Sequence, residues 1–214
     1  MYFASRIQAG RMLATKVSEK YDDQNCTVMA LSDGGVLVGT QIAIKLDCPL
    51  TLLSSADISL PREPMALAGI APGGTFSYNH NYSDGEIDEL VSEFRGFIES
   101  EKLTQIHNLN QLIGAGGTIS RKTLTDHTII IVSDGLTTGF EVDLAVQFLK
   151  PVPITKIVVC TPFAGVQAVD RIHVLANELF CLSVIADLID VNHYYDNNEI
   201  PSHKIILEML DQLV

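Results

Sequence analysis

Apolar and polar positions follow two different periods along this chain. Ala9, Leu13 and Val17 recur at helical intervals behind a capping-box pair, Ser5 and Gln8, which predicts an amphipathic helix over 5–20. Further helices are predicted where the same spacing returns: 36–46, 141–149, 166–179 and a closing helix from Ser202 to Leu213. Short apolar runs predict buried strands at 27–31, 50–53, 128–132, 156–160 and 180–186. Strands that alternate with helices predict an α/β fold with a mainly parallel sheet and helices on both faces.

Residues 54–127 interrupt this alternation. Pro61, Pro64, Pro72 and the pair Gly73-Gly74 predict hairpins or loops, followed by a helix over 84–101. The segment 108–121 contains Gly114-Ala115-Gly116-Gly117 and is predicted to be a loop, which either closes over a ligand or is a plain flexible connection. No repeat or domain boundary is visible. The expectation is one domain over 1–214 with an insertion near 54–127.

Composition narrows the classes of function. The chain has 14 Lys and Arg against 26 Asp and Glu, a net charge of −12, which repels nucleic-acid backbones, and its only basic doublet is Arg121-Lys122. No apolar stretch approaches the roughly 20 residues that a membrane helix needs, and the first residues lack a secretion signal. The six histidines show no metal-ligand spacing. The four cysteines are widely spaced and form no Cys-x-x-Cys pair, which indicates reduced core thiols: Cys26, Cys48, Cys160 and Cys181. Together these features lead us to expect a cytoplasmic protein that binds neither membrane nor nucleic acid.

The strand 128–132 runs directly into a polar turn that opens a helix. This turn reads Ser133-Asp134-Gly135-Leu136-Thr137-Thr138-Gly139. Its threonines and glycine offer backbone N–H groups and hydroxyls at a helix N-terminus, which suits a phosphate, and Asp134 could accept hydrogen bonds from sugar hydroxyls. The alternative is that Ser133, Asp134 and Thr138 only cap a helix.

A second glycine-containing turn, Ser32-Asp33-Gly34-Gly35, follows the strand 27–31. Together the two turns resemble those of the type I phosphoribosyltransferases, in which an acidic strand end with a Thr-rich turn binds phosphoribosyl pyrophosphate (PRPP) and a Gly-Gly turn binds pyrophosphate. Weaker similarity to predicted bacterial members of that family extends to Phe3-Ala4-Ser5-Arg6 and to 192–195, so that the resemblance spans nearly the whole chain.

The resemblance implies a type I phosphoribosyltransferase-like fold in which the insertion serves as a hood. It also implies displacement of Mg²⁺-bound pyrophosphate from PRPP by an acceptor such as a nucleobase, with homodimerisation as a family expectation. By that mapping Asp134, the catalytic candidate, holds the ribose hydroxyls. Thr137, Thr138 and Gly139 hold the 5-phosphate. Gly34 and Gly35 hold pyrophosphate.

Three residues depart from the family pattern. Ser133 stands where the first acid of the pair is expected, Asp33 stands where an arginine is common, and Glu141 stands where a phosphate-binding threonine is common. A like-charge contact at ~4 Å costs about 4 kcal/mol at an effective dielectric near 20. Two hypotheses therefore remain open. The chain is either a phosphoribosyltransferase that uses Mg²⁺ with PRPP and serves nucleotide metabolism, or a catalytically inactive relative that acts as a ligand sensor or oligomeric interaction module.

Overall fold

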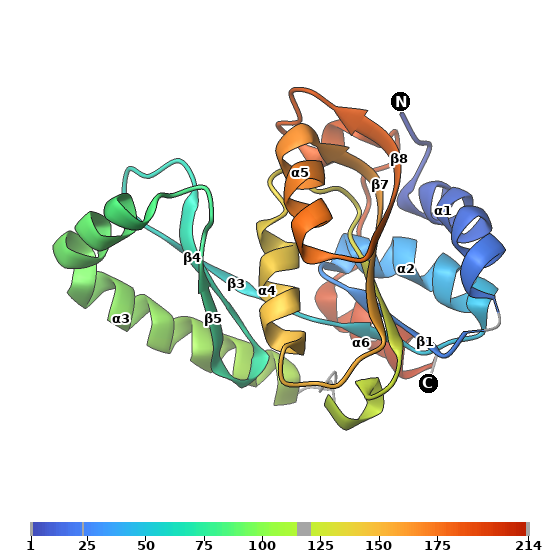
Figure 1. Ribbon diagram of the computed structural model, residues 1–214, viewed down its shortest axis with the longest axis horizontal. Helices are drawn as coiled ribbons and strands as arrows, with labels where there is room; N and C mark the ends of the chain where they lie inside the picture. The colour runs from blue at the N-terminus through green and yellow to red at the C-terminus, as the bar shows by residue number, and fades with distance from the viewer. Residues whose placement is uncertain (1, 23, 115–120, 213–214) are drawn as a thin grey trace.

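A five-stranded parallel sheet forms the centre of the protein (Figure 1). The computed structural model describes residues 2–22, 24–114 and 121–212. The strands are β1 (Cys26–Ala30), β2 (Leu50–Leu52), β6 (Thr128–Val132), β7 (Lys156–Gly165) and β8 (Glu178–Ile185). Their order is β2-β1-β6-β7-β8, so the direction of winding reverses between β1 and β6. In sheets of this kind ligands bind at the carboxyl ends of the strands beside such a reversal.

Helices cover both faces of this sheet, as predicted. Alternate residues of each strand point to opposite sides: Val28 and Ile130 pack with α1 (Arg6–Tyr21), α2 (Asp33–Leu46) and α6 (His203–Asp211). Met29 and Ile131 pack on the other face, against α4 (Phe140–Leu149) and α5 (Val166–Leu175). Because both faces of these strands are buried, β1 and β6 are apolar at every position except Thr27 and Thr128. Among the described helices none is both long enough and apolar enough to span a bilayer.

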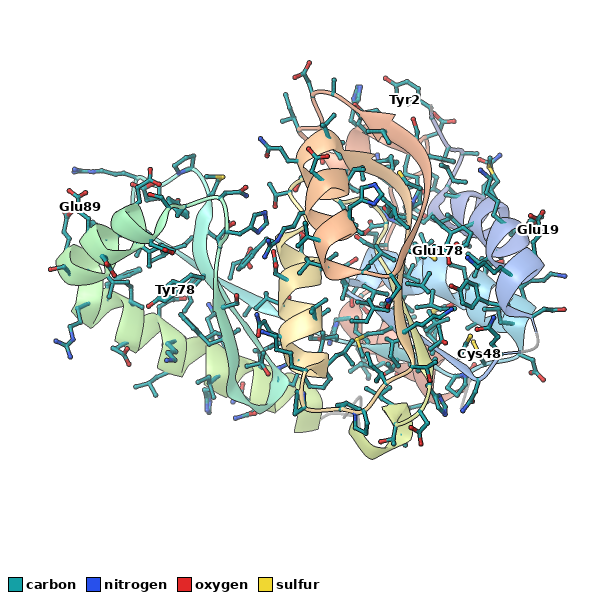
Figure 2. All side chains as sticks on the ribbon, viewed as in Figure 1. Tyr2, Glu19, Cys48, Tyr78, Glu89 and Glu178 are labelled. Carbon is teal, nitrogen blue, oxygen red and sulfur yellow. The ribbon has the colours of Figure 1, made fainter. Side chains whose placement is uncertain are left out.

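The N-terminal helix is fastened at both of its ends. Ser5 Oγ accepts a hydrogen bond from the Gln8 amide at 3.2 Å, and Gln8 Oε1 accepts one from the Ala4 amide at 2.7 Å, much as the capping-box spacing predicts. At the other end Glu178, labelled in Figure 2, accepts hydrogen bonds from Lys20 Nζ at 2.7 Å and Tyr21 OH at 2.6 Å. These contacts place the start of α1 over the carboxyl ends of the strands.

The insertion is more regular than its sequence suggests. A three-stranded antiparallel sheet of β3 (Ala56–Ser59), β4 (Ala66–Ala71) and β5 (Thr75–Tyr78) lies between α4 and the long helix α3 (Asp84–Gly114), to the left in Figure 1. Ala68 and Ile70 of β4 face α3, whereas Gly69 between them approaches α4. A side chain at Gly69 would lie 2.4 Å from Leu144 Cδ1 of α4. The insertion unit, defined as residues 56–114, is therefore packed directly on the central domain.

Several predicted boundaries were wrong. The helix predicted over 84–101 continues to Gly114 because Ile106 and Leu109 still pack on the small sheet; the predicted loop 108–121 therefore begins inside α3, and 115–120 lie outside the described residues. β7 continues to Gly165, beyond the predicted end at 160, by pairing with β8 on both sides of Pro162. The helix predicted over 166–179 ends at Leu175, where Ala176 turns to an extended conformation.

The close approach of α1 to α2 generates a stability prediction. A Cβ at Gly10 would lie 2.7 Å from the backbone oxygen of Val38, and a backbone atom cannot move aside as the end of a flexible side chain can. A Cβ at Gly96 of α3 would meet open space. We expect Gly10→Ala to destabilise the protein by about 1–3 kcal/mol through overpacking. The matched change Gly96→Ala should stabilise it by about 0.5–1 kcal/mol, because alanine is the better helix former. Urea unfolding of both variants measures this, and equal effects would contradict the packing argument.

Candidate functional site

A cavity of about 370 Å³ opens at the carboxyl ends of β1 and β6, where the strand order reverses. It joins the two turns that the sequence singled out, because parallel neighbours end at the same edge of a sheet. Its walls come from α1, from both turns, from α4 and from the C-terminal segment: Arg6, Leu31, Ser32, Asp33, Gly34, Ser133, Asp134, Gly135, Glu141, Val191, Asn192 and Ile200.

An ion pair between Arg6 and Asp134 lines this cavity. Arg6 Nε donates to Asp134 Oδ2 at 2.7 Å, with Arg6 2% and Asp134 8% exposed. Arg6 Nη2 donates to Asn192 Oδ1 at 2.7 Å, and the guanidinium lies 4.5 Å from the centre of the Tyr195 ring, a cation–π arrangement. Tyr195 OH in turn donates to the backbone oxygen of Asp134. Burial raises the pKa of Tyr195 well above its ordinary value, and the Asp134 carboxylate raises it further, so this hydroxyl stays protonated and remains a donor.

Asp134, the predicted ribose ligand, is already held on both carboxylate oxygens. Oδ2 accepts from Arg6, and Oδ1 accepts from the Ser32 hydroxyl at 2.9 Å. Ser133 is also engaged locally, since its hydroxyl donates to the Gly135 oxygen at 3.0 Å. Each Asp134 oxygen keeps a second lone pair, so the carboxylate can still accept a hydrogen bond from a ligand hydroxyl in the cavity.

The turn between β6 and α4 leaves its central amides available. Leu136 anchors it to β7 by two backbone hydrogen bonds, Leu136 N–H to the Phe163 oxygen at 3.1 Å and Gly165 N–H to the Leu136 oxygen at 2.8 Å. Among the described residues no acceptor contacts the amides of Thr137, Thr138 and Gly139, and both threonines are partly exposed. Thr138 Oγ1 accepts weakly from the Phe140 amide at 3.4 Å, but the N-cap of α4 is Gly139, and no side chain caps this helix. These three residues lie beside the cavity and not in its lining.

The second turn is a helix start. Ser32 caps α2 by accepting from the Gly35 amide at 2.8 Å, so Asp33, Gly34 and Gly35 form the first turn of the helix and not a loop before it. Glycine is required at position 34, because a Cβ there would lie 2.1 Å from Asp134 Oδ2. Asp33 is not free: its Oδ1 lies 2.8 Å from His203 Nδ1 of α6.

Glu141 faces the cavity from the first turn of α4. Its Oε2 is buried without a hydrogen-bond partner among the described residues. Burial raises the pKa of this carboxyl, and the neighbouring Asp57, Asp134 and Asp143 carboxylates raise it further, against the lowering effect of its own amide. A raised pKa increases the fraction of Glu141 that is neutral and weakens the repulsion that it exerts on an anion.

The structure thus brings Asp33, Gly34, Ser133, Asp134 and Gly135 into one cavity and leaves Gly35, Leu136 and the Thr-Thr-Gly residues as its supports or neighbours. Sequence reasoning assigned no role in the site to four residues: Arg6, Asn192, Tyr195 and His203. The first three lie in the terminal segments that carried the weaker part of the family resemblance. That weaker resemblance was the only feature of the sequence that could have pointed to these three residues.

Magnesium has no preformed cage here. Among the described residues no three His, Cys, Asp or Glu side chains are grouped closely enough to bind a metal. The carboxylate oxygens of Asp33 and Asp134 are of the kind that Mg²⁺ prefers, but octahedral Mg²⁺ usually takes most of its ligands from substrate phosphates and water. The donor set therefore fits a magnesium ion that arrives with a phosphorylated ligand.

Comparison with known proteins agrees with this geometry. No family model matches the chain. Two curated proteins, from Mycobacterium tuberculosis strains CDC 1551 and H37Rv, are 26% identical over 211 residues, which is 98% of this chain and 46% of theirs. Both carry the provisional name phosphoribosyl transferase. The resemblance to the phosphoribosyltransferases is confirmed. This chain spans about half the length of those curated relatives.

The fold is shared with solved structures. The protein TT1426 from Thermus thermophilus superposes with a TM-score of 0.77 at 23% identity, and the match covers all of both chains. The AQ2163 protein from Aquifex aeolicus reaches a TM-score of 0.50 at 14% identity, over 86% of this chain and 77% of that protein. The predicted α/β fold, with a parallel sheet and helices on both faces, is confirmed and is the fold of these solved proteins.

Glu141 makes stability depend on pH in a defined direction. Because its pKa is raised in the folded protein, the folded state binds more protons than the unfolded state, and stability falls as pH rises from about 4.5 towards the folded pKa. We expect Glu141→Gln to match the wild type near pH 4 and to exceed it at pH 7, by about 1.4 kcal/mol for each unit of pKa elevation. Urea unfolding across this range measures the difference. Glu99→Gln on exposed α3 controls for the loss of one negative charge, and an equal gain in that variant would contradict the assignment.

Proposed function

We propose that this protein binds PRPP, or another sugar phosphate, and transfers its phosphoribosyl group to an acceptor with release of pyrophosphate. The observation that carries the proposal is the meeting of two helix N-termini, those of α2 and α4, at one cavity with the Asp134 carboxylate between them. Helix N-termini attract phosphate groups, and a carboxylate accepts from sugar hydroxyls.

Each part of such a ligand finds a partner of suitable chemistry. The amides of Thr137, Thr138 and Gly139 suit a terminal phosphate, and the remaining lone pairs of Asp134 suit ribose hydroxyls. The first turn of α2 suits the pyrophosphate group. In the reaction the acceptor attacks the anomeric carbon as the bond to pyrophosphate breaks, and the electron pair leaves with pyrophosphate. The chain contributes positioning and stabilisation of the departing charge. Mg²⁺ bound with the ligand would supply further positive charge to the leaving group.

The proposal includes a role for the insertion unit, which would act as a hood over the bound ligand. His80, which follows β5 of this unit, places Nδ1 2.6 Å from Asp143 Oδ2 of α4, and Asp143 also pairs with Arg171 of α5. This contact brings the segment after β5 to α4, the helix that carries Glu141. The cytoplasmic location and the homodimer stay predictions.

The second candidate is a phosphoribosyltransferase fold that has lost catalysis and works as a ligand sensor or interaction module. The observation in its favour is the engagement of Asp134 by Arg6 and Ser32, which leaves fewer lone pairs for ribose. Ser133 adds no second carboxylate. The two candidates differ in turnover, and both require the cavity to bind a phosphorylated ligand.

Ligand binding is the first test. Isothermal titration calorimetry and thermal unfolding with PRPP and Mg²⁺ should show heat of binding and a rise in melting temperature of about 5–10 °C at a hundredfold excess over Kd, because a ligand that binds only the native state stabilises it. Release of pyrophosphate in the presence of nucleobases separates the enzyme from the sensor. If millimolar PRPP produces no heat of binding and no thermal shift, both candidates are refuted for this ligand.

Restoring the residues common in the family at positions 33 and 133 tests whether charge at these positions limits PRPP binding. If Asp33 and the missing acid weaken binding, the double variant Ser133→Asp with Asp33→Arg should bind PRPP about tenfold more tightly or better. Asp33→Asn is the matched control, because it removes a negative charge without adding a positive one, and it should give a smaller gain. An unchanged Kd in the double variant, with the fold verified by circular dichroism, would refute the idea that charge at these two positions limits affinity.

A further inference from the structure

Arg6 has a hydrogen-bond donor that nothing in the described protein satisfies. Nε and Nη2 are used by Asp134 and Asn192, but Nη1 is buried and has no acceptor among the described residues. The side chain is 2% exposed and belongs to the cavity wall. A buried charged donor without an acceptor costs a few kcal/mol, so natural proteins rarely leave one unless a ligand or an ordered water completes it.

The N-terminus of α2 lies against the same guanidinium. A Cβ built at Gly34 would come within 2.8 Å of Arg6 Nε, so the backbone of this turn is as close to the arginine as glycine allows. The amides of Asp33 and Gly34 precede the first backbone hydrogen bond of the 14-residue helix, which Val36 donates to Ser32. Two independent features, an unsatisfied guanidinium nitrogen and a helix N-terminus, therefore converge on one wall of the cavity.

We propose that Arg6 Nη1, together with the first-turn amides of α2, binds the diphosphate group of the ligand. This rests on the proposed function and assigns the group that contacts the anion. Arg6 would then supply, from the N-terminal helix, the positive charge that phosphoribosyltransferases commonly place where this chain has Asp33. It is a binding and positioning residue with two duties, since Nε orients Asp134 while Nη1 contacts the ligand.

The other charges around the cavity leave room for an anion on this wall. The Asp134 carboxylate is paired with Arg6 itself, and Asp33 Oδ1 lies 2.8 Å from His203 Nδ1 of α6. Glu141 of α4 also lines the cavity, and burial raises its pKa and so reduces its negative charge. An arginine that keeps a free N–H beside a helix N-terminus is a better partner for phosphate oxygens than for any neutral group.

The test uses inorganic pyrophosphate as the probe, titrated calorimetrically into the full chain with and without Mg²⁺. Arg6→Lys keeps the positive charge and can still pair with Asp134 but removes the second donor, so we expect pyrophosphate binding to weaken ten- to a hundredfold. Arg11→Lys is the matched control: Arg11 lies on the same helix, is exposed, and donates to Gln41 Oε1 at 3.2 Å. Its Kd should stay within twofold of the wild type. Equal Kd values in wild type and a folded Arg6→Lys would overturn the inference and indicate that water satisfies Nη1.

Failure of this inference can be distinguished from failure of the proposed function. Unchanged PRPP affinity in Arg6→Lys would refute the role of Arg6 and leave PRPP binding in place. Pyrophosphate binding that depends on Arg6, in a protein that does not bind PRPP, would support the diphosphate site and refute PRPP as the ligand.

A second measurement does not depend on the variant folding. Wild-type crystals soaked with methylene diphosphonate, a non-hydrolysable diphosphate, should show a phosphonate oxygen within about 3.2 Å of Arg6 Nη1. Diphosphonate bound elsewhere in the cavity, with Nη1 bonded to water, would contradict the proposal.

Discussion

The ion pair between Arg6 and Asp134 connects parts of the chain that are far apart in sequence. It joins α1 to the end of β6, and through Ser32, Asn192 and Tyr195 it also holds the end of β1 and the C-terminal segment. Removing one partner of such a buried pair costs about 3–5 kcal/mol, because the other charge is left without compensation. Arg6 and Asp134 also line the cavity, so the stability of this region and the geometry of the site depend on one interaction.

This arrangement changes the meaning of the unusual residues in the two turns. If each were a free, ionised carboxylate, Asp33, Asp134 and Glu141 would repel a phosphorylated ligand. In the fold Asp134 is paired with Arg6, burial raises the pKa of Glu141, and Asp33 Oδ1 lies 2.8 Å from His203 Nδ1. The acidic character of the chain therefore says little about the local potential at the site, since pairing and desolvation decide that potential.

Fold and chemistry are connected by the reversal of strand order between β1 and β6. Parallel strands that lead away from this point in both directions leave an open crevice at their carboxyl ends, and each strand there leads into the N-terminus of a helix. Two such N-termini facing one crevice suit a ligand with phosphate groups at both ends. The insertion unit, packed through Gly69 on α4, stands beside the crevice without contributing to its lining.

The sequence by itself determined the alternation of strands and helices, the parallel sheet and the two turns at its carboxyl edge, because those features follow from local periodicity and from capping and glycine-rich patterns. It underestimated the insertion unit, whose strands and long helix are stabilised by contacts such as Ala68 and Ile70 with Leu109, which are distant in sequence. Only the tertiary structure decided that Arg6 and Tyr195 belong to the site and that Asp33 is paired. These contacts join residues 61 to 186 positions apart, and no local pattern encodes which distant partner a buried charge will find.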